Sequence, residues 1–231
     1  SKKFIISQEF EQAIPLLQQA SKLNIPEAQY NLGVIDENGY ATEKNIDSAY
    51  YWYQKSANQG WNDGLYKMMM AHAQGTGAEQ DYPKAFEYAL ECALNNDPTC
   101  MHNVVTAYKD GFGTEKDSDK MLEWAIKLGK LENPEHLLKS GKITSARLAL
   151  AYWYRDGDIL EKNILKAYAW FLIYNENKID FSGRQQMFVI TEIKALEALL
   201  TDEELINAST KAEKIFSRQL MNKAKIHEME Y

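Results

Sequence analysis

Glycine returns every 36 residues along the first half of this chain, at Gly39, Gly75 and Gly111. Two more columns keep the same step, one of alanines and one of large side chains: Ala13, Ala49 and Ala85, then Leu16, Trp52, Tyr88 and Trp124. A fourth unit follows after a step of 46 residues, at Gly157, which a single insertion of ten residues within 128–144 explains. Such a period restricts the chain to architectures in which one small unit is stacked several times.

Each unit is predicted to form two antiparallel helices. The first helix of each pair has alanine, leucine and tyrosine at helical spacing and ends at a column glycine, which can adopt the left-handed conformation that caps a helix. These runs are 28–38, 65–74, 101–110 and 146–156. A polar loop follows, and the second helix begins near Asp47, Pro83 or Asp119, residue types suited to a first turn. No alternating strand of convincing length occurs, so the predicted fold is all-α: a solenoid of αα-hairpins wound as a right-handed superhelix.

The period also predicts how the chain is divided. Residues 1–25 form a partial repeat, and after residue 177 the period disappears. Two helices are expected there, at 185–200 and 205–225, and Thr201 to Glu204 is an N-terminal cap signal between them. We interpret this end as a helical cap, because a stack of repeats needs a polar-faced element to cover its last apolar face. The predicted divisions are repeats at 26–61, 62–97, 98–143 (with the insertion at 128–144) and 145–179, followed by a cap at 180–231.

The amino-acid sequences of these repeats resemble those of a known family. The run AQYNLG from Ala28, the pair Asn38-Gly39 and the run DSAYYWYQKSANQG from Asp47 are similar to the Sel1-like repeat, an αα-hairpin relative of the tetratricopeptide repeat. The third unit carries the same family's loop, YKDGFGTEKD, from Tyr108. The resemblance extends from about residue 10 to residue 175. It implies an adaptor or partner-binding scaffold.

Composition narrows the class of partner. The chain has 26 basic and 33 acidic side chains, a net charge of −7. A negative balance disfavours non-specific binding to nucleic acid and attraction to an anionic membrane. No apolar run approaches the roughly 18 residues that span a bilayer. We therefore expect a protein or peptide partner, no nucleic acid, no integral membrane segment and a monomer in the free state.

Cys92 and Cys100 are the only two cysteines, and both occupy columns of small residues. The equivalent pairs in other units are Ser56 with Gly64 and Ala20 with Ala28. Small residues in both columns indicate that the end of one helix closely approaches the start of the next, and a disulfide needs Cα atoms about 4.4–6.8 Å apart. Such a bridge would close a nine-residue loop and stabilise the fold by roughly 2.5 kcal/mol. The alternative is that both cysteines are small buried residues of a reduced protein.

The location of the protein depends on those cysteines. The segment from Cys92 to Cys100 also resembles the paired cysteines of bacterial cysteine-rich Sel1-repeat proteins, which are exported. A disulfide would indicate the periplasm or the exterior, and reduced thiols would indicate the cytoplasm. The chain begins Ser1-Lys2-Lys3 without a signal-type apolar segment, which fits either a cytosolic protein or a mature or trimmed chain.

The sequence offers no pattern typical of catalysis. Its paired loop glycines lack the third glycine of a dinucleotide loop, and no Gly-x-Ser-x-Gly elbow occurs. The histidines do not have the spacing of metal ligands: His72, His102, His136 and His227. We expect no enzyme activity, no cofactor and no metal site.

The concave side of the solenoid is the predicted binding surface, because the first helix of each pair lines it. Aligning Leu32-Gly33 with the large–small pair of the tetratricopeptide repeat directs four columns inward, and they include the Tyr, Met and Arg residues that interfaces favour. A competing interpretation packs Tyr30 and Tyr66 between repeats. The predicted partner-binding residues are Tyr30, Val34, Glu37, Asn38, Tyr66, Met70, Gln74, His102, Thr106, Lys109, Asp110, Tyr152, Arg155 and Asp156, with Ala73 and Leu148 in the same columns.

Two functions of different classes remain open. The first is a non-enzymatic scaffold that binds a protein or peptide, in its specific form an immunity or inhibitor protein against a secreted bacterial toxin. The second is a binder of a small ligand or peptidoglycan fragment, or a weak hydrolase of the cysteine-rich Sel1-repeat type. The sequence also leaves open whether the concave groove or the insertion at 128–144 meets the partner.

Overall fold

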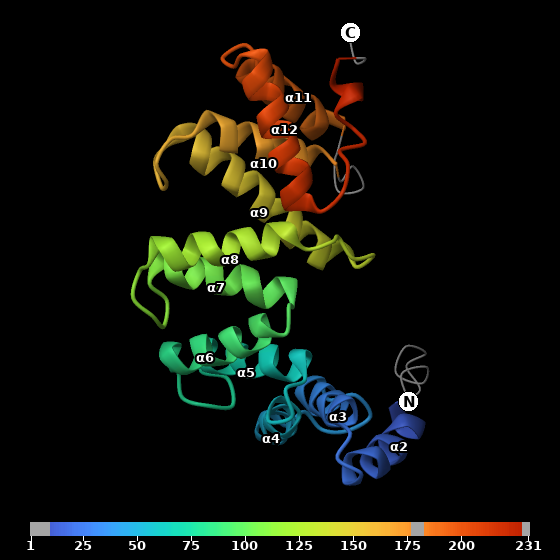
Figure 1. The fold of residues 1–231 in the computed structure, drawn as a ribbon. Helices are drawn as coiled ribbons and strands as arrows, with labels where there is room; N and C mark the ends of the chain where they lie inside the picture. The colour runs from blue at the N-terminus through green and yellow to red at the C-terminus, as the bar shows by residue number, and fades with distance from the viewer. Residues whose placement is uncertain (1–9, 177–182, 228–231) are drawn as a thin grey trace. The chain divides into compact units, whose positions relative to one another are not determined.

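We analysed a computed structural model that describes residues 10–176 and 183–227 (Figure 1). Every regular element in these residues is a helix, and they include no strand. The chain forms two compact units, unit 1 (Ser1–Asp117) and unit 2 (Ser118–Tyr231). Unit 1 contains α2 (Phe10–Lys22), α3 (Pro26–Asn38), α4 (Ile46–Ala57), α5 (Asn62–Gln74), α6 (Tyr82–Leu94) and α7 (Pro98–Asp110). Unit 2 contains α8 (Ser118–Lys130), α9 (Leu137–Asp156), α10 (Ile164–Asn175), α11 (Gly183–Glu197), α12 (Asp202–Phe216) and the short 3₁₀ turn η1 (Ala224–Ile226).

Helices that follow one another in the chain pack side by side within each unit. In unit 1, the helices from α2 to α7 each contact the next, and in unit 2 α9 packs against both α8 and α10. The predicted all-α fold of stacked αα-hairpins is therefore confirmed. None of the helices in the described part of the chain combines the length and the apolar character that crossing a membrane requires.

The column glycines end the first helix of each pair, as predicted. Gly39 has a φ of 71° and donates its N–H to the Ile35 carbonyl at 2.8 Å, and Gly75 and Gly111 have the same left-handed conformation. Side chains without this freedom rarely adopt a positive φ, which explains why glycine recurs there. The second helices α4, α6 and α10 are capped by Asn45, Asp81 and Asn163, whose side chains accept a backbone N–H of the first turn.

Small residues occur where two helices approach each other most closely. A Cβ atom on Gly33 would lie 2.6 Å from the Tyr53 ring, and one on Gly64 would lie 2.7 Å from the Ser56 hydroxyl. That hydroxyl donates to the Pro26 carbonyl at 2.8 Å. The predicted close approach of the two small-residue columns is therefore real, and it depends on residues that lack bulk.

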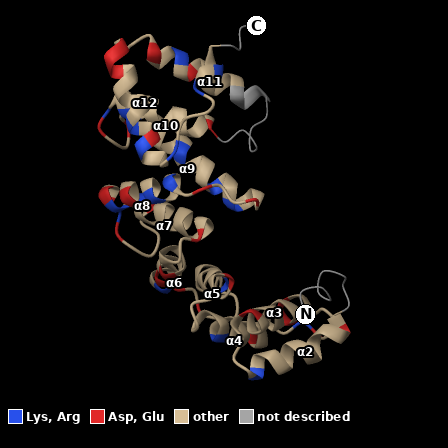
Figure 2. Ribbon diagram, turned by 45° about the vertical axis from the view of Figure 1, so that its right-hand side comes forward, with Lys and Arg blue, Asp and Glu red and all other residues tan. Residues whose placement is uncertain are grey.

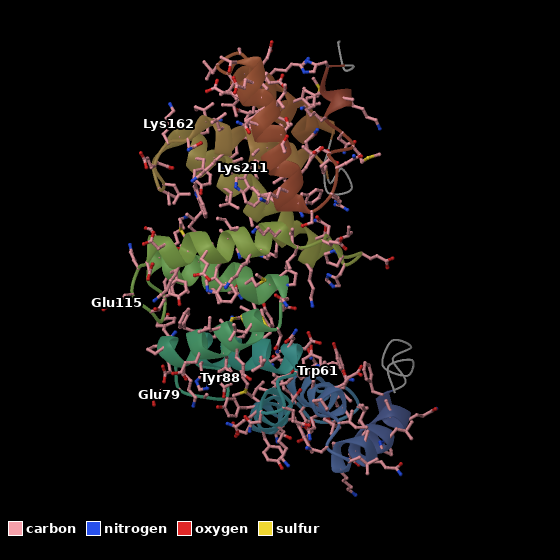
Figure 3. All side chains as sticks on the ribbon, in the orientation of Figure 1. Trp61, Glu79, Tyr88, Glu115, Lys162 and Lys211 are labelled. Atoms are coloured by element: carbon pink, nitrogen blue, oxygen red, sulfur yellow. A yellow bond between two sulfur atoms is a disulfide. The ribbon has the colours of Figure 1, made fainter. Side chains whose placement is uncertain are left out.

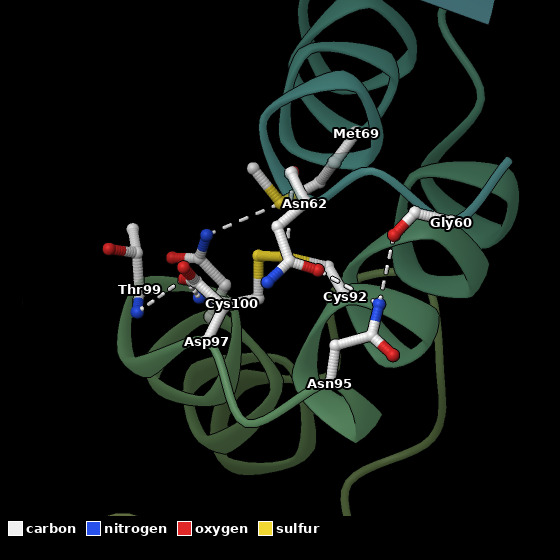
Figure 4. The surroundings of a disulfide bond; sticks show 9 residues. Gly60, Asn62, Met69, Cys92, Asn95, Asp97, Thr99 and Cys100 are labelled. Atoms are coloured by element: carbon white, nitrogen blue, oxygen red, sulfur yellow. Dashed lines mark hydrogen bonds between the residues drawn. A yellow bond between two sulfur atoms is a disulfide. The ribbon is translucent and has the colours of Figure 1, made fainter. Parts of the chain in front are cut away.

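The same approach one repeat later holds a disulfide between Cys92 and Cys100 (Figure 4). Their Cα atoms are 5.7 Å apart, and both side chains are fully buried. Cys92 lies near the end of α6, and Cys100 lies in the first turn of α7, where the Asp97 carboxylate accepts the N–H groups of Thr99 and Cys100. The bridge thus ties the end of one hairpin to the start of the next, in place of the contact between Ser56 and Gly64.

The ten-residue insertion is folded and does not form a long loop. Helix α9 has 20 residues against 13 in α7, and six residues precede it against three before α7, so seven extra residues lengthen the helix and three lengthen the loop. Arg147, which is fully buried, organises this region. Its guanidinium donates to the carbonyls of Gly129 (2.8 Å) and Leu131 (2.7 Å) and to the side-chain oxygen of Asn133 (2.7 Å).

The C-terminal helices act as the predicted cap. Helices α11 and α12 both pack against α10, and the residues of α10 from Ala167 to Asn175 are all buried. The Tyr168 hydroxyl donates to Glu197 of α11 at 2.8 Å. The capping box of Thr201 and Glu204 opens α12, at the N-terminal cap signal that the sequence predicted. A helix that is apolar on all sides, as α10 is, must be covered on all sides.

The prediction that this last helix continues to residue 225 is wrong. Helix α12 ends at Phe216, and Ser217 takes a left-handed conformation with a φ of 57°. The chain then turns back because the Glu176 carboxylate, at the end of α10, accepts the backbone N–H groups of Met221 and Asn222, each at 2.8 Å. A long-range contact of this kind leaves no periodic signal in the sequence.

Candidate functional site

The predicted binding residues lie on the first helices of the repeats, and we call the surface that they share the column face. In unit 1 it consists of residues of α3, α5 and α7: Tyr30, Val34, Glu37, Asn38, Tyr66, Met70, Gln74, His102, Thr106, Lys109 and Asp110. In unit 2 it consists of residues of α9: Tyr152, Arg155 and Asp156, with Leu148 one turn earlier. The two parts differ in what surrounds them.

The column face of unit 1 contains a first hollow of about 160 Å³ where α3, α4 and α5 meet. Four predicted residues line it, and aromatic side chains of α4 complete the wall. The predicted residues are Glu37, Tyr66, Met70 and Gln74, and the aromatic residues are Tyr50 and Tyr53. The sequence columns placed the four predicted side chains on the same side of the solenoid. The structure shows in addition that side chains of two successive repeats line one hollow.

A second and more apolar hollow, of about 350 Å³, lies between α5, α6 and α7. Tyr66 and Met70 line this hollow as well as the first, so the two lie next to each other along α5. Ala73 and Thr106 complete the predicted part of its lining. Aromatic side chains form the remainder of the wall and the rim: Tyr82, Phe86 and Phe112, of which Tyr82 and Phe112 are about half exposed.

Of the residues that the structure describes, Glu37 is the one acidic residue lining the first hollow, and the protein itself neutralises it. Its carboxylate accepts a hydrogen bond from the Tyr53 hydroxyl at 2.7 Å and is ion-paired with Lys67. Burial alone would raise the pKa of Glu37, but the hydrogen bonds from Lys67 and Tyr53 outweigh it and hold this pKa below its ordinary value. Glu37 thus links α3, α4 and α5, and a partner would meet a paired carboxylate there.

Tyr30 serves mainly in packing. Its ring centroid lies 5.7 Å from that of Tyr53, and burial, followed by the charges of Asp63 and Glu37, raises the pKa of Tyr30 to about 12. Tyr66 differs, because it lines both hollows. Of the two tyrosines for which packing between repeats was the competing interpretation, Tyr30 fits that interpretation and Tyr66 fits a place in a binding surface.

Several predicted residues of unit 1 lie outside the hollows. Asn38, Lys109 and Asp110 are exposed near the ends of their helices, and the Asn38 side chain donates to the Val34 carbonyl at 2.8 Å. Val34 and His102 are half-buried and line neither hollow. These residues share a face with the hollows, but the structure does not bring them into either.

In unit 2 the same columns are occupied by contacts to the cap. The Arg155 guanidinium donates to Glu192 of α11 at 2.6 Å and to Asp156 at 2.6 Å, and it stacks 4.5 Å from the centre of the Tyr152 ring. The Tyr152 ring also packs edge-on against Phe171 of α10 at 5.3 Å. The hydrogen bond from Arg155 lowers the pKa of Asp156. Tyr152 and Arg155 thus hold α9 to α10 and α11, and Asp156 pairs with Arg155 on the same helix.

Several residues of the hollows escaped the sequence analysis because they belong to second helices and loops. Tyr50 and Tyr53 come from α4, Phe86 from α6, and Phe112 follows the glycine that ends α7. An exposed aromatic residue after a helix-ending glycine was the one available signal. His72, which the sequence analysis noted only for lacking metal-ligand spacing, is buried; its ring stacks on that of Tyr88 with centroids 5.7 Å apart. Figure 3 labels Tyr88.

One group of side chains has the residue types of a metal site. Among the described residues, Cys92, Asp97 and Cys100 form the only group of three acidic, histidine or cysteine side chains close enough to hold an ion. The two sulfur atoms share a disulfide, so neither is a thiolate ligand, and Asp97 caps α7. We infer no metal site from this group.

Comparison with known proteins places the repeats in a family. The Sel1 repeat model matches residues 26–61, 63–97, 105–133 and 144–173. No curated protein matches the chain.

Solved structures that align with most of this chain include two bacterial proteins. A Sel1 repeat protein from Oxalobacter formigenes superimposes with a TM-score of 0.68 and 20% identity, over 92% of this chain and 82% of that one. The protein c5321, a protective antigen of uropathogenic Escherichia coli strains with an SLR fold, gives a TM-score of 0.42 and 20% identity, over 94% of this chain and 51% of that one. The first likeness concerns the fold alone, and the second is too low to support an inference.

Proposed function

Because this chain belongs to the Sel1 repeat family, whose repeats typically serve in protein–protein interaction, we propose that the column face of unit 1 binds a protein or peptide partner. The observation that carries this proposal is the pair of adjoining hollows that share Tyr66 and Met70. Aromatic and methionine side chains around a concavity are the groups that interfaces favour. Two hollows that lie next to each other can each accept one side chain of a single bound segment.

The binding test uses one substitution at the shared wall. Met70→Arg places a charged side chain between the two hollows, and we expect it to weaken binding of a partner isolated from the native host by about 2 kcal/mol or more. The matched control is Met187→Arg, because Met187 is about half exposed on α11 of unit 2. Calorimetric titration measures the affinity, and circular dichroism verifies the fold. Equal affinities of both variants would contradict the proposal.

The finer form of the proposal concerns location and partner. The disulfide between Cys92 and Cys100 supports an oxidising compartment, which we propose to be the periplasm or the exterior. A secreted toxin and its inhibitor could meet there, so an immunity or inhibitor role is the specific form that we propose. Identification by mass spectrometry of the protein cross-linked to the column face tests it. A host protein unrelated to any toxin would contradict the immunity role and leave the scaffold role intact.

Binding of a small ligand or a peptidoglycan fragment is the second candidate function. The observation that favours it is the size of the second hollow, about 350 Å³, because small-molecule sites usually measure about 300–1,000 Å³. Neither hollow is lined by a serine, cysteine or histidine of the described residues, so we propose binding without hydrolysis. Titration of muropeptides against the chain and its Met70→Arg variant tests this function.

A further inference from the structure

Unit 2 contains a hollow of about 240 Å³ that does not belong to the column face. It lies between α8, α9, α10 and α12, and its walls come mainly from the second helices and the cap. Figure 1 shows α12 lying against α10 in this unit. The hollow is therefore a feature of the last repeat together with its cap.

Three lysines line this hollow, and we call it the lysine pocket. Lys130 is the last residue of α8, Lys166 lies in the first turn of α10, and Lys211 lies in α12. Figure 2 shows basic residues in blue on each of these helices, and Figure 3 labels Lys211. Within the described part of the chain, no acidic side chain lines the lysine pocket, and none of the three lysines is ion-paired with a carboxylate.

The surplus of positive charge is local. Unit 2 as a whole has 17 basic and 17 acidic side chains. Other basic side chains of this unit form ion pairs, as Arg155 does with Glu192 and Lys127 does with Glu123. Ammonium groups that share one hollow repel one another, and an anion that enters it relieves the repulsion. A cleft lined by one sign of charge also concentrates counter-ions.

Lys166 alone would not indicate a binding site, because Lys84 and Lys120 occupy the same column in the preceding repeats. What distinguishes the fourth repeat is its surroundings. Helix α12 adds Lys211 from one side, and Lys130 at the end of α8 adds a third cation from another. The cap therefore turns an ordinary repeat position into part of a converging cluster.

The floor of the lysine pocket is apolar and aromatic. Trp170 is almost fully buried beneath it, and Ile126 and Ile215 are half-buried in its walls. The Lys166 ammonium lies 4.8 Å from the centre of the Tyr154 ring, so one cation already rests on the aromatic wall. A ligand complementary to both the three lysines and the apolar floor carries negative charge around an apolar group.

We propose that the lysine pocket binds an acidic segment of a protein partner, in which one bulky apolar side chain enters the floor and flanking carboxylates meet the three lysines. A lone inorganic anion would leave the apolar floor uncovered. An anionic membrane would face the whole chain, whose net charge of −7 opposes it, whereas a short segment faces mainly the lysines within a Debye length of about 8 Å.

The test uses a rhodamine-labelled peptide, acetyl-Gly-Asp-Glu-Phe-Glu-Asp-Gly, and fluorescence anisotropy with the full chain. We expect Lys130→Gln, Lys166→Gln and Lys211→Gln together to weaken binding at least about tenfold, because all three cations are removed from the contact. The matched variant Lys142→Gln, Lys162→Gln and Lys225→Gln loses the same charge outside the lysine pocket, and we expect a change below about twofold. Replacing the peptide's phenylalanine by alanine, or its acids by amides, should also weaken binding.

Three results would overturn the proposal. The first is equal loss of affinity in the two triple variants, which would indicate attraction by overall charge. The second is equal binding of the alanine peptide, which would remove the role of the floor. The third is binding of inorganic phosphate, or of vesicles of phosphatidylglycerol and phosphatidylcholine, through the same lysines without binding of the peptide. None of these results bears on the column face of unit 1, because Met70→Arg tests that surface separately.

Discussion

Units 1 and 2 are built from the same repeat but present different surfaces. In unit 1 the column face contains two hollows around Tyr66 and Met70. In unit 2 the equivalent columns are joined to the cap through Arg155 and Glu192. The charge differs as well: unit 1 has nine basic and 16 acidic side chains, whereas unit 2 has 17 of each, so the whole net charge of the chain resides in unit 1.

This difference teaches that a repeat column identifies a face and does not decide whether that face is free. Tyr152 occupies the column of Met70, yet its ring packs against Phe171 and Arg155. Arg155 is in turn held by Glu192 of α11, which lies outside the repeated sequence. Binding surfaces in a capped solenoid are therefore best sought in repeats that the cap does not reach.

The largest effect should come from removing the cap. A chain that ends at Glu176 lacks α11 and α12 and exposes α10, which is buried on all sides from Ala167 to Asn175. We expect it to associate or precipitate, because uncapped solenoid ends are poorly soluble. Deleting residues 1–25 is the matched change in unit 1, where it removes α2 from the buried apolar residues Ala28, Leu32 and Ile35 of α3. Because α3 also carries half-buried and exposed residues, we expect this variant to associate less than the chain that ends at Glu176. Size-exclusion chromatography compares them; equal behaviour would mean that the cap is not specific to unit 2.

The next largest effect should follow from Arg147→Met. The substitution keeps the bulk of the side chain but removes its hydrogen bonds to the carbonyls of Gly129 and Leu131. Hydrogen bonds to charged groups contribute about 1.5–3 kcal/mol each, so we expect a loss of at least about 3 kcal/mol in the free energy of unfolding. Urea denaturation measures it. Arg218→Met, which removes an exposed guanidinium stacked 3.9 Å from the centre of the Phe216 ring, should cost at most about 1 kcal/mol.

Reduction of the disulfide should destabilise unit 1 by a smaller amount. The chain-entropy model gives about 2.5 kcal/mol for the nine-residue loop that Cys92 and Cys100 close. The matched variant is Cys92→Ser with Cys100→Gly, which reproduces the pair Ser56 and Gly64, and its melting temperature should not respond to reductant. Mass spectrometry of the native protein, alkylated without reductant, reports the redox state; two alkylated thiols would refute the bridge and return the protein to a reducing compartment.

The smallest expected effect separates the two parts of the column face. Arg155→Ala breaks a partly exposed ion pair with Glu192 and should lower the free energy of unfolding by about 0.2–1 kcal/mol without changing partner affinity. Met70→Ala should weaken partner affinity and leave the free energy of unfolding nearly unchanged, because Met70 lines both hollows and joins no ion pair. Thermal melts and calorimetric titration of each variant test the contrast. A partner that binds Arg155→Ala more weakly would place unit 2 in the binding surface.

The parts of the fold that local rules specify could be predicted from the sequence. Gly39, Gly75 and Gly111 end helices because of backbone conformation, and Thr201 opens α12 through a local capping box. The close approach at Ser56 and Gly64 was visible as a column of small residues. These features depend on residues that are close in the sequence, so the period or a local motif indicates them directly.

The candidate site was only partly predictable, because it depends on contacts between distant segments. The columns included Tyr66 and Met70, which line the hollows, but they also included Arg155, whose partner Glu192 belongs to the cap. The lysine pocket needs α8, α10 and α12 together, and no spacing in the sequence relates Lys130 to Lys211. Likewise, the Glu176 carboxylate holds the segment that follows α12 through the N–H groups of Met221 and Asn222, a contact across the unit.

Site-specific photo-crosslinking in the native host tests most directly whether unit 1 carries the binding face. The cross-linking residue p-benzoylphenylalanine replaces Met70 in one variant, Tyr152 in a second and the exposed Leu94 in a third as a background control. We predict a defined cross-linked species from position 70 that is absent at positions 152 and 94. The same species from position 152 and none from position 70 would contradict the assignment of the binding face to unit 1.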